Sequence, residues 1–167
     1  GVIGNHRVLE EEVRGHGVEF AHVPTPKGGR EAAEEELLAG LAGRCAVVVL
    51  ARFMQILSGD FLDRLALRII NIHHSFLPAF PGAAPYRRAH ERGVKIIGAT
   101  AHYVTEELDD GPVIDQDDAR VRHRATVCDV VRTGADIERG VLARVDPWHL
   151  EDPTTGPETE RAGLAGR

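Results

Sequence analysis

The chain has 167 residues, 43% of them hydrophobic and 28% charged, and a formal net charge of −6. This length suits one domain with a buried core, and the acidic balance argues against a nucleic-acid surface and favours a small-molecule partner. Two cysteines, Cys45 and Cys128, offer neither a disulfide framework nor a four-cysteine zinc site. With no apolar run of roughly 20 residues and no signal peptide at the start, the sequence predicts a cytoplasmic protein with no membrane partner.

The first part of the chain predicts strands and helices in alternation. The opening residues resemble the end of a strand, a helical pattern covers 6–14, and 18–23 has the pattern of a strand. Residues 31–41 are rich in Ala, Glu and Leu and predict a helix. We interpret the Glu-rich runs at 10–12 and 34–36 as solvated helix faces.

The next elements continue this alternation. The continuous apolar run at 45–50 predicts a parallel strand covered on both faces. A short helix is expected over 60–67, capped by Ser58 or Asp60, before a strand over 68–72. The order of elements predicts an α/β fold with a doubly wound, mostly parallel sheet.

The remaining elements close the predicted fold. We expect a brief helix at 86–92 and strands over 94–104 and 112–121, for which an antiparallel arrangement is open. The apolar stripe over 126–145 (Val127, Val130, Val131, Ile137, Val141 and Leu142) predicts a helix packed on the sheet. Pro147 should bend or end that helix.

Polar side chains cluster just past two of these apolar runs, where open sheets bind their ligands. Asn71 and His73 are two apart on an extended segment, so they can point into one pocket. On these residues alone, a turn-capping Asn71 and a hydrogen-bonded strand-end histidine remain an alternative. A zinc site from His73, His74, His102 and Asp109 is a further alternative, but adjacent histidines on a strand point to opposite faces, so we expect no metal.

Two long motifs carry a resemblance to a known family. They are Asn-Ile-His-His-Ser-Phe-Leu-Pro-Ala-Phe at 71–80, with Gly82 and Tyr86 beyond it, and Gly-Ala-Thr-Ala-His-Tyr-Val-Thr at 98–105, followed by Leu108-Asp109. Together they resemble the formyltransferase superfamily that uses 10-formyltetrahydrofolate. The resemblance covers roughly residues 1–150. It implies a Rossmann-like formyltransferase fold that here lacks its first strand and helix, and no cofactor, because the folate is the substrate.

The resemblance assigns a catalytic set to three residues. The family uses an asparagine, a histidine two residues on and an aspartate in a Leu-Asp motif, which match Asn71, His73 and Asp109. An amide and an imidazolium aimed at the oxygen of a formyl group under attack would stabilise the oxyanion. The carboxylate would favour the protonated imidazole, order the attacking water and shuttle its proton. Asp110 is adjacent, but the Leu-Asp motif selects Asp109.

The resemblance also implies residues that bind the substrate or support the site. One wall of a pterin pocket would contain Arg52, Phe53, Met54, Ile56 and Leu57, and the opposite wall Val104, Thr105, Glu106 and Leu108. Arg52 would meet the carboxylate tail of the folate. Support is expected from His74, His102, Gly82 and Tyr86.

The paired histidines bear on the reaction. His-His-Ser-Phe-Leu-Pro is typical of the hydrolytic members of the superfamily. We therefore expect hydrolysis of 10-formyltetrahydrofolate to formate and tetrahydrofolate, supplying formate for purine biosynthesis and balancing one-carbon folate pools. The alternatives are a glycinamide ribonucleotide formyltransferase, or another formyltransferase that uses the same donor, and an inactive folate-binding fragment. The sequence predicts a catalytic domain over 1–150, incomplete at its N-terminus, and a disordered tail over 151–167, and it leaves a homo-oligomer open.

Overall fold

A computed structural model describes residues 1–151, and for 146–151 it describes only the helical backbone. The tail predicted over 151–167 lies outside the described residues, apart from Glu151, which is helical. The chain divides into two compact units. The first contains residues 1–45 and 57–66, and the second contains 46–56 and the chain from 67 onward.

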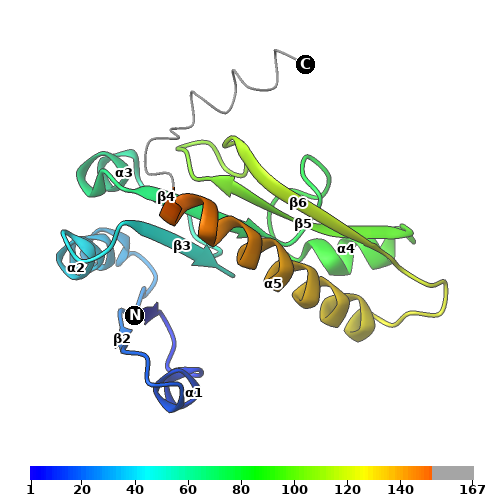
Figure 1. The fold of residues 1–167 in the computed structure, drawn as a ribbon, viewed down its shortest axis with the longest axis horizontal. Coiled ribbons are helices and arrows are strands. Elements are labelled where there is room, and N and C mark those ends of the chain that lie inside the picture. Colours follow the sequence, from blue (N-terminus) through cyan, green and yellow to red (C-terminus); the bar gives the residue numbers. More distant parts are fainter. Residues whose placement is uncertain (152–167) are drawn as a thin grey trace. The chain divides into compact units, whose positions relative to one another are not determined.

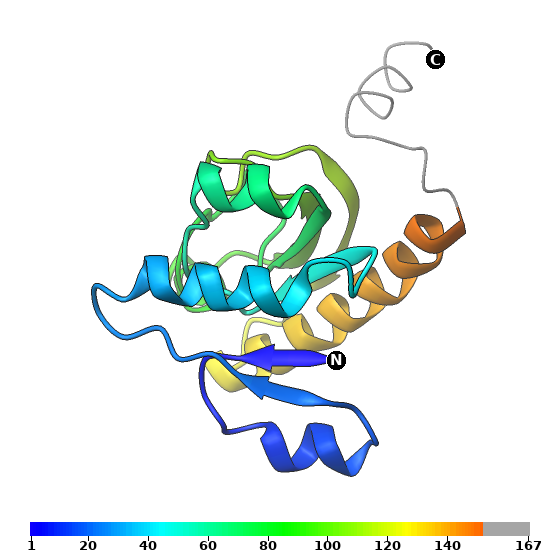
Figure 2. The same ribbon diagram turned by 90° about the vertical axis from the view of Figure 1, so that its left-hand side faces the viewer.

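The first unit contains two short strands and three helices. They are β1 (Val2–Gly4), α1 (Glu10–Gly15), β2 (Phe20–His22), α2 (Arg30–Leu41) and α3 (Gly59–Leu65). β1 and β2 pair in parallel, with Val2 opposite Phe20 (Figure 2). The order of strand, helix and strand predicted for this part of the chain is therefore confirmed.

A buried carboxylate joins α2 to the start of α3. Ser58 caps α3 by accepting a hydrogen bond from the Phe61 N–H, as one of the two predicted caps. Glu34 accepts hydrogen bonds from the Ser58 N–H at 2.9 Å, from the Ser58 hydroxyl at 2.6 Å and from Arg30 Nε at 3.0 Å. Burial raises the pKa of Glu34, but these donors outweigh it and the net pKa is lowered. The interpretation of 34–36 as a solvated face is therefore wrong for Glu34.

The second unit contains a four-stranded sheet and two helices. Its elements are β3 (Val47–Ala51), β4 (Arg68–His73), α4 (Pro85–Glu91), β5 (Ile96–Tyr103), β6 (Val113–Arg120) and α5 (Val127–Glu151). The strand order is β3-β4-β5-β6 (Figure 1). β3 and β4 are parallel, and β5 is antiparallel to both β4 and β6, as the sequence left open.

β3 differs from its prediction. Val47 to Leu50 are half-buried instead of covered on both faces. Within the described residues β3 pairs with β4 alone and lies at the edge of its sheet. The apolar run predicted the strand correctly but not its burial, because an edge strand and a central strand can share the same composition.

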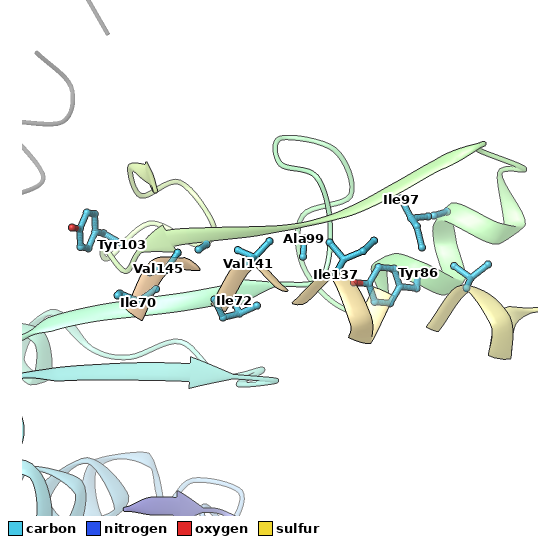
Figure 3. Packing of buried hydrophobic residues seen from close by; sticks show 12 residues of the cluster. Ile70, Ile72, Tyr86, Ile97, Ala99, Tyr103, Ile137, Val141 and Val145 are labelled. Atoms are coloured by element: carbon cyan, nitrogen blue, oxygen red, sulfur yellow. The ribbon is translucent and has the colours of Figure 1, made fainter. Parts of the chain in front are cut away.

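The two faces of this sheet have different partners. Ile70 and Ile72 of β4, with Ala99 and Ala101 of β5, belong to a core cluster that includes Ile137, Val141 and Val145 of α5. Figure 3 shows these α5 side chains packed against the strands. Successive strand residues point to opposite faces, so Asn71, His73, Thr100 and His102 lie on the face away from α5.

Helix α5 confirms most of its predicted stripe. Val130, Ile137 and Val141 are buried, whereas Val131 is 41% exposed and that part of the prediction is wrong. The helix continues through Pro147 to Glu151, so Pro147 does not end it, and a bend there stays a prediction. A proline removes one hydrogen bond from a helix, but the flanking turns can continue. None of the helices in the described part of the chain has the length and apolar character that a membrane crossing requires.

Candidate active site

β4 and β5 bring an amide and an imidazole together. Their antiparallel register places Asn71 opposite His102, and Asn71 Nδ2 lies 3.1 Å from His102 Nε2. His102 Nδ1 lies 2.9 Å from the Tyr103 carbonyl oxygen and donates to it. His102 Nε2 is therefore an acceptor for one Asn71 N–H, which leaves the second N–H of that amide for another partner.

Asp109 reaches the same face from the turn between β5 and β6. Its Oδ1 lies 3.3 Å from His73 Nδ1 and 3.9 Å from His102 Nε2, and its side chain is 5% exposed. The Gly82 N–H donates to Asp109 Oδ2 at 2.9 Å. At Gly111 a Cβ would lie 1.7 Å from the Tyr103 carbonyl oxygen, so only glycine permits this turn to close against β5. The predicted set Asn71, His73 and Asp109 thus converges in one place.

His73 is buried between two acceptors. Its Nδ1 faces Asp109, and its Nε2 lies 3.4 Å from the Phe80 carbonyl oxygen. Burial lowers the pKa of His73, and this exceeds the opposing effects of Asp109 and of the Phe80 carbonyl; His102 and His74 lower it further. Asp109 therefore favours the protonated imidazole as predicted, but burial, which the prediction did not weigh, has the larger effect and makes the net pKa shift downward.

Two polar residues that the sequence reasoning missed anchor the loop after β4. Thr100 Oγ1 donates to the Ser75 carbonyl at 2.7 Å and accepts from the Leu77 N–H at 3.0 Å. Gln116 Nε2 donates to Thr100 Oγ1 at 2.9 Å and to the Leu77 carbonyl at 3.0 Å. The anchored loop carries the Phe80 carbonyl and the Gly82 N–H into the site. A polar pair on neighbouring strands was a signal that could have identified them.

The residues predicted to support the site separate by face. His102 contacts Asn71, and Gly82 contacts Asp109. His74 and Tyr86 lie on the α5 side, where both approach Glu138, a residue that the sequence reasoning did not select.

The residues predicted to bind the substrate are mostly exposed. In the second unit, Arg52, Met54, Ile56, Thr105, Glu106 and Leu108 are exposed, and Phe53 and Val104 are half-buried. Arg52 has a positive φ of 53°, which turns the chain sharply after β3. Leu57 is buried and belongs to the first unit, so the structure does not group it with the others.

Metal ligation was an alternative for the histidines. Within residues 1–151, no group of three or more His, Cys, Asp or Glu side chains is arranged to hold a metal ion. His73 and His74 each face a different carboxylate, as their alternation on the strand predicts. Cys45 and Cys128 are both free thiols.

Comparison with known proteins identifies relatives over most of the chain. Residues 6–145 match the family described as formyl transferase. The chain is 59% identical over 151 residues to a formyltetrahydrofolate deformylase from Mycobacterium tuberculosis, covering 90% of this chain and 49% of that protein. A solved formyltetrahydrofolate deformylase from Pseudomonas syringae is 52% identical, with a TM-score of 0.82, and the match covers 90% of this chain and 51% of that one.

A solved glycinamide ribonucleotide transformylase from Symbiobacterium toebii is more distant. It is 38% identical with a TM-score of 0.74, and the match covers 83% of this chain and 68% of that one. The chain spans about half the length of the curated relatives it matches.

Proposed function

Because the chain belongs to the formyl transferase family, we propose that it carries the catalytic groups of a 10-formyltetrahydrofolate hydrolase, which releases formate and tetrahydrofolate. The observation that carries the proposal is the convergence of Asn71, His73 and Asp109 on one sheet face, with a free amide N–H beside a histidine–carboxylate pair. Identities of 59% and 52% to two deformylases, against 38% to a transformylase, favour hydrolysis over formyl transfer.

The amide supplies the electrophilic part of the mechanism. When water attacks the formyl carbon, the carbonyl oxygen gains negative charge and needs donors already in place. The second N–H of Asn71 is such a donor, because its first N–H is held by His102. This hydrogen bond strengthens as the charge develops, so it stabilises the transition state more than the substrate.

The His73–Asp109 pair manages the protons. His73 begins neutral and Asp109 begins as a carboxylate, so the pair can accept one proton from the attacking water. The new C–O bond forms as that O–H bond breaks, and the imidazolium produced lies beside the oxyanion. The same proton then passes to the folate nitrogen as the C–N bond breaks and the C=O bond re-forms, which leaves formic acid and tetrahydrofolate and restores the pair. The formic acid then loses its own proton to water and leaves as formate.

Substrate binding is proposed for the exposed segments beside the site. Met54 and Ile56, together with Phe53, would form one apolar wall for the pterin, and Val104, Thr105, Glu106 and Leu108 the other. Arg52, exposed on its sharp turn, would pair with the carboxylate tail. The family match spans residues of both compact units, which supports one catalytic domain over 1–150.

The cellular role follows from the reaction. We place the activity in the cytoplasm, where it would provide formate for purine biosynthesis and balance the one-carbon folate pools. No cofactor is needed in this scheme, because water and the folate supply all the reacting atoms.

The first test replaces the carboxylate that handles the protons. Asp109→Asn should lower kcat for formate release by about 10² to 10⁴, as loss of general acid–base catalysis does, while folate binding stays within a few-fold of the unmodified protein. Asp110→Asn is the matched control, because Asp110 is adjacent and exposed and should keep normal turnover. Normal turnover in Asp109→Asn would overturn the assignment.

The resemblance to a transformylase supports the second candidate, formyl transfer to an amine. Adding glycinamide ribonucleotide to 10-formyltetrahydrofolate separates the two reactions. Formate release that is unaffected by the amine supports hydrolysis, whereas formylated amine in excess of formate supports transfer. Folate binding with neither product would identify an inactive folate-binding fragment.

A further inference from the structure

Three polar side chains meet on the α5 face of the sheet, directly behind the catalytic histidine. Tyr86 of α4 donates its hydroxyl to Glu138 Oε1 at 2.9 Å. His74, which follows β4, places its Nε2 3.3 Å from Glu138 Oε2. The side chains of His74 and Glu138 are 16% and 13% exposed. These three residues, which we call the α5-side cluster, therefore connect α4, α5 and the end of β4 in a largely buried environment.

Close packing of α5 makes this meeting possible. Gly134 lies one helical turn before Glu138, and a Cβ there would be 2.1 Å from the Tyr86 ring. The ring of Tyr86 therefore lies directly against the backbone of α5, within the core that Figure 3 shows. This contact holds the Tyr86 hydroxyl within hydrogen-bonding distance of Glu138.

The charges of the α5-side cluster follow from its contacts. The Tyr86 hydroxyl donates to Glu138 Oε1, and Oε2 of the same carboxylate faces the His74 ring. His74 Nε2 is buried and has no hydrogen-bond partner, so the carboxylate at 3.3 Å is the group that can compensate a proton there. Burial, and then the negative charge of Glu138, raises the pKa of Tyr86, while Arg52 opposes this. Tyr86 therefore remains a neutral donor, and the cluster holds one anion.

The α5-side cluster lies next to the catalytic residue. The ring centroids of His73 and His74 are 6.5 Å apart, and the ring planes are inclined by 25°. The titratable groups that face His73 are Asp109, His102 and His74, and those that face His74 are His73, Glu138 and Tyr86. A positive charge on His74 opposes a second one on His73.

We propose that Glu138 holds His74 as an imidazolium, and that this buried ion pair is a positioning device which keeps the adjacent His73 neutral and ready to accept a proton. The inference rests on the proposed function for the catalytic role of His73. His74 and Glu138 act through His73, because their contacts lie on the opposite face of the sheet from Asn71 and Asp109.

The test is a pH titration of the His73 ring in the intact protein, in which NMR of labelled imidazoles reports the midpoint. Glu138→Gln removes the anion, so His74 becomes neutral and His73 accepts its proton more readily. For the loss of one positive charge about 6.5 Å away, as in His74→Gln, we expect the His73 midpoint to rise by roughly 0.5 pH unit or more, and by less in Glu138→Gln, where an anion is lost as well. His74→Gln removes the cation directly and should raise the midpoint in the same direction.

Tyr86→Phe is the matched control. It removes the hydroxyl that contacts Glu138 but keeps both charges, so the His73 midpoint should not change. An unchanged or lower midpoint in a folded Glu138→Gln protein would overturn the proposal, as would an equal rise in Tyr86→Phe, which would assign the effect to packing. If Glu138→Gln does not fold, an unchanged midpoint in His74→Gln overturns it in the same way.

Formate release separates this inference from the proposed function. If the unmodified protein releases no formate but Glu138→Gln still raises the His73 midpoint, the result supports the ion pair and contradicts the hydrolase. In a protein that releases formate, the acid limb of kcat/KM should move upward with the His73 midpoint in Glu138→Gln. A limb that stays in place while kcat falls would show a merely structural role and overturn the proposal.

Discussion

Two histidine–carboxylate pairs lie on opposite faces of one sheet, on consecutive residues of the chain. His73 faces Asp109 and His74 faces Glu138, each at 3.3 Å. Asp109 completes its contacts with a backbone N–H in a turn, beside an amide that keeps a free donor. Glu138 completes its contacts with Tyr86 inside the core. A histidine–carboxylate pair therefore becomes a candidate for catalysis where hydrogen-bond donors beside it are left for a ligand.

Removing the free Asn71 amide N–H should have the largest effect on activity. Asn71→Ala deletes the amide on the Asp109 side and leaves the α5-side cluster intact. We expect kcat for formate release to fall by about 10² to 10³, the usual effect of losing one oxyanion donor. Steady-state kinetics and a folate-binding assay measure this. A loss of less than tenfold would mean that Asn71 does not meet the developing charge.

The pH dependence of kcat/KM tests the role of His73 in its pair with Asp109. Because burial lowers the pKa of His73 below the usual 6.5, its neutral form persists below that pH. In the proposed mechanism the protonated form cannot accept the proton of water, so kcat/KM should fall on the acid side with a midpoint below 6.5. The fall should approach tenfold per pH unit. Rates measured between about pH 5 and pH 8 test this, and a midpoint above 6.5 would contradict it.

The smallest effect is expected from the packing of α5. Gly134→Ala puts a methyl group into the Tyr86 ring, and we expect overpacking to lower the free energy of unfolding by about 1 to 3 kcal/mol. Gly140→Ala on the same helix meets only Arg144 Nη1 at 3.7 Å. It should raise stability by up to about 1 kcal/mol, because alanine has the better helix propensity. Denaturant unfolding of both variants measures the contrast, and equal effects would contradict the close contact.

Much of the fold could be predicted from local patterns. Apolar runs and helix signals located the strands and helices, and Ser58 was one of two predicted caps. Side-chain alternation placed Asn71 and His73 on one face and separated His73 from His74. The family motifs gave the catalytic set, although the roles of those residues remain proposals.

Other features depended on contacts between distant segments. Glu34 packs against Ser58, 24 residues away in sequence, whose two donors compensate the burial of its carboxylate. The pattern of its own helix had indicated a solvated face. Within residues 1–151, β3 pairs with β4 alone despite a composition typical of a central strand. The local pattern around Glu138 did not mark it as a site residue, because its partners His74 and Tyr86 come from two other parts of the chain.

The residue types available for chemistry, and the direction of each side chain within its helix or strand, follow from the sequence alone, because local backbone geometry sets that direction. Which carboxylate meets which histidine, and the net lowering of the pKa of His73, follow only from the tertiary structure. Those properties depend on distances and burial summed over every neighbouring element, and no local period carries that sum.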